Sequence, residues 1–187
     1  MKGARLWQVL LWVGWPGYAR CMQKVLVSAC LLGEKVRYDG GDCARHGILD
    51  VWVEQGRVVP LCPETAGGLP TPRPAAEMDG GDGEAVLRGE SRVLRQNGAD
   101  VTSAFMDGAE AALAACWQHR VKVAVLKEGS PSCGVSRVND GSFTNTKIDG
   151  QGVAARLLAR HGISVFSDDQ LEAAALRLEE LEAAHGE

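Results

Sequence analysis

Several features that mark common protein classes are missing from this sequence of 187 residues. No apolar run approaches the roughly 18 residues that a membrane-spanning helix requires, so we expect no membrane partner. Lysine and arginine are not clustered, and the formal net charge is −4. A nucleic-acid polymer is therefore a poor partner, because backbone binding needs a basic patch. Internal repeats and linkers are also missing, which favours one domain.

The first 21 residues differ from the rest of the chain. Basic residues precede a short apolar run with three tryptophans, as in a secretory signal, but no small-residue cleavage site follows. A strand pattern then begins afresh at Met22. We expect residues 1–21 to be an N-terminal extension outside the fold, with a weak signal as the alternative. Residues 22–187 are predicted to form a single α/β catalytic domain in the cytoplasm.

Apolar runs alternate with amphipathic segments along these residues. The runs typical of buried parallel strands span residues 24–32, 57–64, 122–129 and 163–167. The helical patterns span residues 48–56, 101–120, 150–162 and 169–186. This alternation predicts an α/β fold with a three-layer, open, mainly parallel sheet, Rossmann-like, with helices on both faces.

Three further expectations concern the segments between these elements. Residues 65–84 are rich in glycine and proline without periodicity, which predicts a long functional or disordered loop. Two short apolar runs around Gly89 predict a hairpin over residues 84–102. Asp168 precedes the last helical pattern and is placed to cap it.

Paired cysteines are also missing, since none of the six follows another at the C-x2-C spacing typical of structural zinc. A chain of this length with ordinary helix and strand patterns does not need disulfides. Three cysteines stand at the ends of three predicted strands: Cys30, Cys62 and Cys133. Because ligands bind at the carboxyl ends of parallel strands, we expect the three thiols at one rim. One such cysteine alone indicates a core residue, but three together favour a metal site.

Three thiolates favour an iron–sulfur cluster, whose ligands can come from distant loops. With three protein ligands one iron stays open, which suits catalysis better than electron transfer. The remaining cysteines have other interpretations. Cys116 falls on an apolar helix face and is predicted to be core, and Cys21 belongs to the extension. Cys43 lies beside His46 and is a bystander or an extra ligand.

Side chains suited to acid–base chemistry flank these thiols. Glu64 follows Cys62 by two residues and is placed for proton transfer. Ser130 and Ser132 flank the turn before Cys133 and are expected to bind substrate or a developing anion.

Two further groups are candidates for substrate binding. Arg37, Tyr38 and Asp39 follow the first thiol loop, where the alternative is a solvated turn. Arg73 and Glu77 in the long loop either close over the site or form a flexible surface ion pair.

Three stretches together resemble the thiouracil desulfidase family, first catalogued as a domain of unknown function: "VLVSACLLGEKVRYDGG", "VPLCPETAGGLPTPRPAAEM" and "VLKEGSPSCGVSRVNDGSFT". The resemblance covers about residues 24–170. It implies a 4Fe-4S cluster with one non-protein-ligated iron, its three cysteines matching Cys30, Cys62 and Cys133. A family glutamate and serine match Glu64 and Ser130. The implied reaction removes sulfur from a thiocarbonyl such as thiouracil, giving the oxo-base and sulfide without net redox change.

One departure and two alternatives accompany this resemblance. Many members carry a further cysteine where Val36 stands, which leaves Cys43 as a local substitute. A non-catalytic iron–sulfur or zinc module, acting as sensor or accessory domain, would share the cysteines but leave Glu64 and Ser130 without a role. A metal-free cysteine nucleophile would need a nearby histidine. The small-molecule enzyme is expected to be a monomer or weak homodimer.

Overall fold

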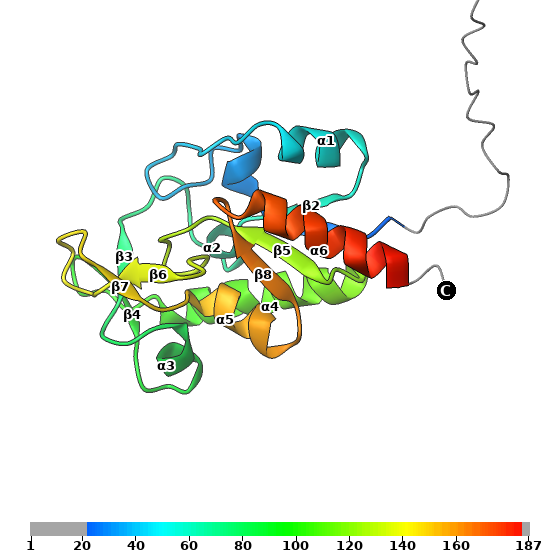
Figure 1. Ribbon diagram of the computed structural model, residues 1–187. Coiled ribbons are helices and arrows are strands. Elements are labelled where there is room, and N and C mark those ends of the chain that lie inside the picture. The colour runs from blue at the N-terminus through cyan, green and yellow to red at the C-terminus, as the bar shows by residue number, and fades with distance from the viewer. Residues whose placement is uncertain (1–21, 185–187) are drawn as a thin grey trace, which may run out of the picture.

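Four parallel strands form the central sheet of the protein (Figure 1). This computed structural model describes residues 22–184, so the predicted extension lies outside the described residues. The strand order is β2 (Val58–Leu61), β1 (Val25–Ser28), β5 (Val123–Leu126) and β8 (Ser164–Ser167). Each neighbouring pair is parallel, and β1 and β5 are buried along their whole length. The predicted open parallel sheet is confirmed.

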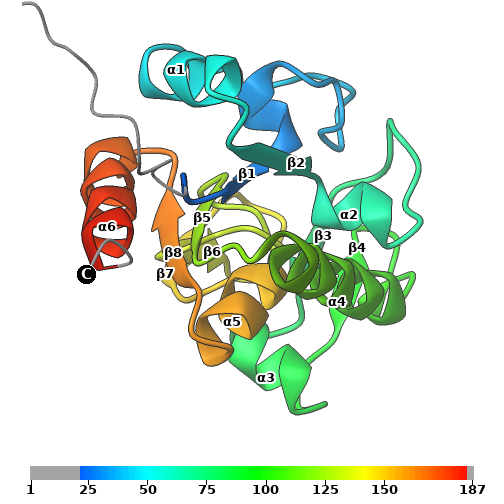
Figure 2. The ribbon, with the colours of Figure 1, turned by 90° about the vertical axis from the view of Figure 1, so that its right-hand side faces the viewer.

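Helices cover both faces of this sheet, as the pattern predicts. One face packs against α4 (Thr102–His119) and α5 (Val153–Arg160), and the other against α1 (Ile48–Glu54) and α6 (Leu171–Ala184). Figure 2 shows the two pairs on opposite sides of the strands. Apolar side chains fill both interfaces, with Leu26 and Leu126 facing α4 and α5, and Val25 and Val27 facing α1 and α6. The alternation along each strand therefore builds a core on each face.

The order of the strands creates a switch point between β1 and β5. The chain moves from β1 outward to β2, then returns past β1 to β5 and on to β8. The connection to β2 passes through α1 on one face, and the connection to β5 passes through α4 on the other. In open α/β sheets, ligands bind outside the carboxyl ends of the strands at such a point.

Two expectations about the middle of the chain are wrong. The segment predicted as a structureless loop, residues 65–84, contains the last two residues of α2 (Pro63–Ala66) and the strand β3 (Ala76–Met78), with a loop between them. The segment predicted as a hairpin contains α3 (Gly83–Leu87) and then β4 (Val93–Arg95), and β4 pairs with β3. Asp82 decides the first turn of α3, because its carboxylate accepts hydrogen bonds from the N–H groups of Glu84 and Ala85.

A second small sheet and the role of Asp168 were also missed. The antiparallel strands β6 (Arg137–Asn139) and β7 (Lys147–Asp149) follow the cysteine turn that ends β5. Each has three residues, too few for an alternating pattern to be visible. Asp168 does not cap α6; its buried carboxylate binds the N–H of Glu128 and the side chains of Lys127 and Arg45. Tertiary contacts override the local signal there.

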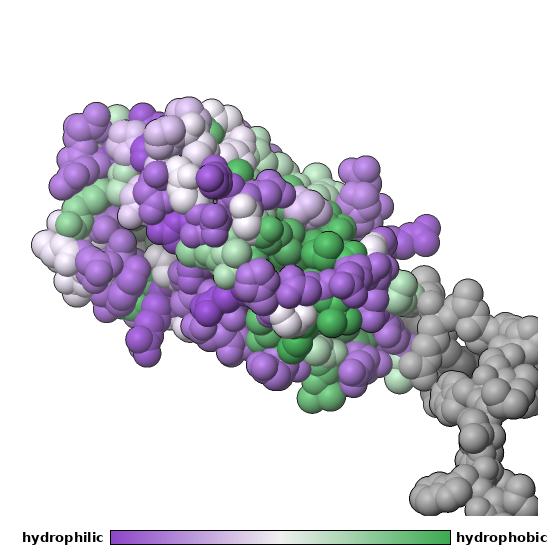
Figure 3. All heavy atoms as spheres, turned by 90° about the horizontal axis from the view of Figure 1, so that it is seen from above, coloured by the Kyte–Doolittle hydropathy of each residue, from purple (hydrophilic) through white to green (hydrophobic). Residues whose placement is uncertain are grey.

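The face drawn in Figure 3 is mostly hydrophilic, with hydrophobic residues gathered on part of it. Large exposed apolar side chains occur on several elements: Val51 and Val53 on α1, Trp117 on α4 and Leu176 on α6. Scattered apolar residues of this kind are ordinary on protein surfaces. Within residues 22–184, no helix has both the length and the apolarity for a membrane span.

Candidate active site

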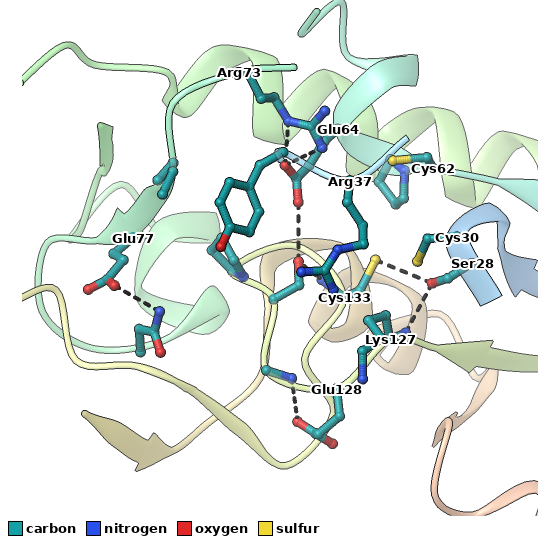
Figure 4. Close-up of a pocket in the computed structure, with 18 of the residues that line it drawn as sticks. Ser28, Cys30, Arg37, Cys62, Glu64, Arg73, Glu77, Lys127, Glu128 and Cys133 are labelled. Atoms are coloured by element: carbon teal, nitrogen blue, oxygen red, sulfur yellow. Dashed lines mark hydrogen bonds and ion pairs between the residues drawn. The ribbon is translucent and has the colours of Figure 1, made fainter. Parts of the chain in front are cut away.

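The three predicted ligand thiols line one cavity of about 510 Å³ at the switch point (Figure 4). Cys30 lies in η1 (Ala29–Leu32), the short helix that directly follows β1. Cys62 is the residue before α2, just past β2, and Cys133 lies in the turn after β5. Three loops far apart in sequence meet here because parallel strands end at one edge of the sheet.

The turn that carries Cys133 is held against the first turn of α5. The N–H groups of Val153 and Ala154 donate to the carbonyl oxygens of Pro131 and Ser132, at 3.0 and 2.9 Å. Gly152 permits this approach, because a Cβ there would lie 2.4 Å from the carbonyl carbon of Ser132. Free N–H groups at a helix start need acceptors, and the cysteine turn supplies them.

A similarly close contact fixes α2, which carries Glu64. A Cβ on Gly67 would lie 1.9 Å from the carbonyl oxygen of Ala104 in α4. A Cβ on Gly108 of α4 would lie 2.0 Å from the carbonyl oxygen of Pro63. The two glycines let the helix backbones touch, so the residues at the start of α2 are set by the position of α4.

Glu64 stands between an arginine and a serine. Its Oε2 accepts from Arg73 Nε at 2.9 Å, and its Oε1 accepts from Ser130 Oγ at 3.2 Å. The same Ser130 oxygen accepts from the N–H groups of Ser132 and Cys133. Arg73 is buried and also donates to the carbonyl oxygen of Val36. Glu64 therefore reaches the cavity with one oxygen fixed by a cation and the other by a hydroxyl.

Burial governs the chemistry of the thiols. Burial, with the negative charge of Cys43 and Cys62, raises the pKa of the Cys30 thiol to about 12. Burial also raises the pKa of Cys133, opposed by a hydrogen bond from Ser28 Oγ to its sulfur at 3.5 Å. Thiolates in such surroundings need a positive partner, and soft metal ions are the partners that thiolates select.

The donor set fits a multi-iron cluster better than a single ion. Among the described residues, no three His, Cys, Asp or Glu side chains converge closely enough to hold one metal ion. The cysteines of a cubane cluster bind separate irons, so they stand further apart than the ligands of one zinc ion. All five cysteines of the described residues are free thiols. Three of them around a cavity suit a 4Fe-4S cluster and argue against structural zinc.

The metal-free cysteine nucleophile finds no support in the described part of the chain. His46, the histidine nearest in sequence to a thiol loop, has a side chain that is 82% exposed and lies against Asp50. No histidine of the described residues lines the cavity. The base that this alternative requires is therefore missing from the site.

The predicted substrate-binding residues divide into two groups. Arg37, Tyr38 and Arg73 line the cavity, and Arg73 also forms an ion pair with Glu64. Asp39 and Ser132 do not line it. The Asp39 carboxylate binds Arg37, whose hydrogen bonds lower the pKa of Asp39 to about 2. Ser132 is fully buried, because α5 packs directly on its backbone.

The remaining expectations on cysteines and on Glu77 are also decided by burial. Cys116 lies in the core, where burial raises its pKa to about 11. Cys43 lies beside Cys30, since its N–H donates to the Cys30 carbonyl oxygen, and its sulfur accepts from Arg37 at 2.7 Å. It does not line the cavity.

Glu77 is buried at the cavity and binds Asn139 and Phe143, so the surface ion pair with Arg73 is not formed.

Several cavity residues were missed at the sequence level. Ser28 ends β1, and Lys127 and Glu128 directly follow β5. The rule that located the cysteines, polar residues at strand ends, would have found these as well. Asn139, Phe143 and Lys147 reach the cavity from the β6–β7 hairpin, for which the sequence carries no comparable signal.

Comparison with known proteins agrees with this geometry. The model of the 2-thiouracil desulfurase family matches residues 25–170, a segment that includes all three cavity cysteines. The chain belongs to the 2-thiouracil desulfurase family. The predicted family and its enzyme class are confirmed.

Two relatives of this family member span most of its length. The uncharacterized protein YbbK of Bacillus subtilis (strain 168) is 42% identical over 147 residues, which are 79% of this chain and 97% of YbbK. The solved structure of the [4Fe-4S]-dependent thiouracil desulfidase TudS (DUF523Vcz) superposes with a TM-score of 0.77 at 47% identity. That match covers 84% of this chain and 98% of TudS. The desulfurase family member therefore has the fold of TudS.

Proposed function

We propose that this protein is an iron–sulfur-dependent desulfidase, which converts thiouracil or a related thiocarbonyl and water into the oxo-base and sulfide without net redox change. The observation that carries the proposal is that Cys30, Cys62 and Cys133 line the same cavity as the Glu64–Ser130 pair. Family membership and the 4Fe-4S dependence of TudS support it. A small-molecule substrate agrees with the size of the cavity.

The three cysteines would hold the 4Fe-4S cluster and leave one iron without a protein ligand. When bound, that cluster supplies a soft Lewis acid, which attracts the thiocarbonyl sulfur and polarises the carbon towards attack by water. The protein's own contribution to holding it is two buried thiols, Cys133 and Cys30, with 6% and 8% exposure, and the partly buried thiol of Cys62. Their enclosure keeps bulk water away from the sulfur ligands.

Glu64 is the general base in this proposal. Its Oε1 reaches the cavity beside Ser130, and Arg73 fixes the other oxygen, so the carboxylate is oriented before substrate binds. Glu64 takes a proton from the attacking water and returns it to the departing sulfur. Ser130, fixed by two backbone N–H groups, holds Glu64 and donates to substrate when Glu64 moves to the water.

Arg37 and Tyr38 are proposed to contact the substrate ring, since both line the cavity. The guanidinium carbon of Arg37 lies 5.7 Å from the centre of the Tyr38 ring, and Asp39 holds the guanidinium by two hydrogen bonds. A planar cation beside an aromatic ring suits a flat, polar heterocycle. In this assignment Asp39 positions Arg37 and does not itself bind substrate.

The test is anaerobic purification followed by iron and acid-labile sulfide analysis and an assay with 2-thiouracil and 4-thiouracil. We expect close to four irons per chain, and uracil and sulfide released in equal amounts. A loaded cluster that releases no sulfide from any thiocarbonyl would instead indicate the non-catalytic sensor or accessory module. Failure to load any cluster would overturn the desulfidase and the iron–sulfur form of that module, and would leave only a zinc-binding module.

We also propose that the enzyme acts in the cytoplasm as a monomer or weak homodimer. Free thiols at all cysteines of residues 22–184 support a reducing compartment. Size-exclusion chromatography with light scattering over a range of concentrations tests the oligomeric state, and fractionation of the source cell tests the compartment.

A further inference from the structure

Lys127 holds a position that the proposed chemistry leaves without a role. It directly follows β5 and lines the cavity beside Ser28, Cys30 and Cys133 (Figure 4). Its backbone N–H donates to Ser28 Oγ at 3.1 Å, and that hydroxyl donates to Cys133 Sγ. The residue is thus tied through one side chain to a ligand thiol.

The ammonium group of Lys127 forms an ion pair with Asp168. Lys127 Nζ lies 2.9 Å from Asp168 Oδ2, and the Asp168 side chain is fully buried. The N–H of Glu128 binds the other carboxylate oxygen at 2.8 Å. Burial alone would raise the pKa of Asp168, but these donors, with Arg45, lower it. The carboxylate therefore stays ionised and fixes the lysine in place.

Asp168 does not fully neutralise the charge of Lys127, because its carboxylate binds two cations. Arg45 binds the same Oδ2 oxygen at 2.8 Å from the side away from the cavity. The single charge of the Asp168 carboxylate is therefore shared between Lys127 and Arg45. Asp169 offers Arg45 a second contact, but the two side chains are 70% and 44% exposed, so solvent screens that pair.

The other cations that line the cavity bind partners other than Asp168. Arg73 binds Glu64 and Arg37 binds Asp39, each through two nitrogens. Lys147 donates to the carbonyl oxygen of Gly129 on the hairpin side. Lys127, by contrast, is tied through the Ser28 hydroxyl to the sulfur of Cys133.

We propose that Lys127, held by Asp168, is the positioned positive charge that compensates the thiolate ligands of the cluster. This inference rests on the proposed function, since it requires a cluster in the cavity. The iron–sulfur core is itself positive, but with three thiolate ligands the cluster is net negative. In a partly buried site, a nearby cation lowers the free-energy cost of that net charge. Positive charge beside an iron–sulfur cluster stabilises its reduced form and so raises its reduction potential.

The experiment compares three lysine variants of the anaerobically reconstituted protein. Lys127→Met removes the charge and keeps most of the side-chain volume, and Lys127→Arg restores the charge. Lys147→Met is the matched control, because it removes a cavity lysine whose ammonium binds the Gly129 carbonyl oxygen instead of Asp168. The readouts are iron content, the reduction potential from a redox titration, and the rate of iron loss to a chelator.

Lys127→Met is expected to have a more negative reduction potential and faster iron loss than wild type. Lys127→Arg and Lys147→Met should both stay close to wild type. If Lys127→Met cannot load a cluster at all, loading by Lys127→Arg still supports the charge role, and failure of both overturns it. A wild-type potential in fully loaded Lys127→Met also overturns the inference while leaving the desulfidase intact. If the wild-type protein holds no cluster, the proposed function itself is wrong.

Discussion

The two sides of the cavity are built by different means. The thiol side, which comprises Cys30, Cys62 and Cys133, is fixed by backbone: each thiol follows a strand of the parallel sheet. The polar side, which comprises Glu64, Arg73, Ser130, Glu77 and Asn139, is fixed by side-chain hydrogen bonds. In the proposed function, cofactor binding therefore depends on topology, whereas proton transfer and substrate choice depend on a network that single substitutions can alter.

The largest expected effect comes from breaking the thiol side. Cys62→Ser should abolish cluster binding and activity, because an alcohol is a poor ligand for soft iron. Iron and acid-labile sulfide analysis after anaerobic reconstitution measures the loss. Cys116→Ala and Cys43→Ala are the controls: the first removes a core thiol and the second a thiol off the cavity. Loss of the cluster in Cys43→Ala would make Cys43 a ligand and contradict this assignment.

Breaking the polar side alone should separate catalysis from cofactor binding. Glu64→Gln keeps the shape of the side chain but removes the base, so kcat should fall by about 10²–10⁴ with unchanged iron content. Glu84→Gln is the matched control, since Glu84 on α3 pairs with Arg156 and Arg160 away from the cavity. Unchanged turnover in Glu64→Gln would exclude Glu64 as the base.

The helix α2 connects the two sides, because Cys62 precedes it and Glu64 lies in its first turn. In Gly67→Ala the new Cβ collides with the Ala104 carbonyl, so α2 must move away from α4. We expect a stability loss of about 1–3 kcal/mol, together with lower iron retention and lower turnover. Thermal unfolding and iron analysis test this.

Gly41→Ala is the control for stability and iron retention, because its Cβ would meet the end of the Asp39 side chain at 3.2 Å and no backbone. If Gly67→Ala lowers turnover without affecting iron retention, the two sides are not coupled through α2.

The smallest effect on activity is expected at Asp168, which binds Lys127 but does not line the cavity. Its pKa is lowered in the folded protein, so its stabilisation is present above the ordinary value of about 4 and is lost as the pH falls through the lowered pKa. Asp168→Asn should cost about 2 kcal/mol at pH 7, and less at pH values below about 4. Urea unfolding at both pH values measures the difference. Asp107→Asn, at an exposed position on α4, is the matched control for this substitution.

The thiol side could be predicted from sequence because its determinants are local. An apolar run predicts a buried strand, and parallel strands place their ends at one edge, so Cys30, Cys62 and Cys133 could be brought together without coordinates. Glu64 and Ser130 followed from their closeness to these cysteines in the chain. Their hydrogen bond to each other, across 66 residues, was not predictable from either sequence neighbourhood.

The positions and partners of the residues on the polar side were decided only by the tertiary structure. Asn139 reaches the cavity on a hairpin too short to have a pattern, and Asp168, expected to cap a helix, is a buried anchor for Lys127. Ser132 carries the same local signal as Ser130 but is buried under α5. Sequence periodicity determined where strands end and therefore where the thiols gather. The direction and partners of each polar side chain depend on packing between distant segments, which no local pattern encodes.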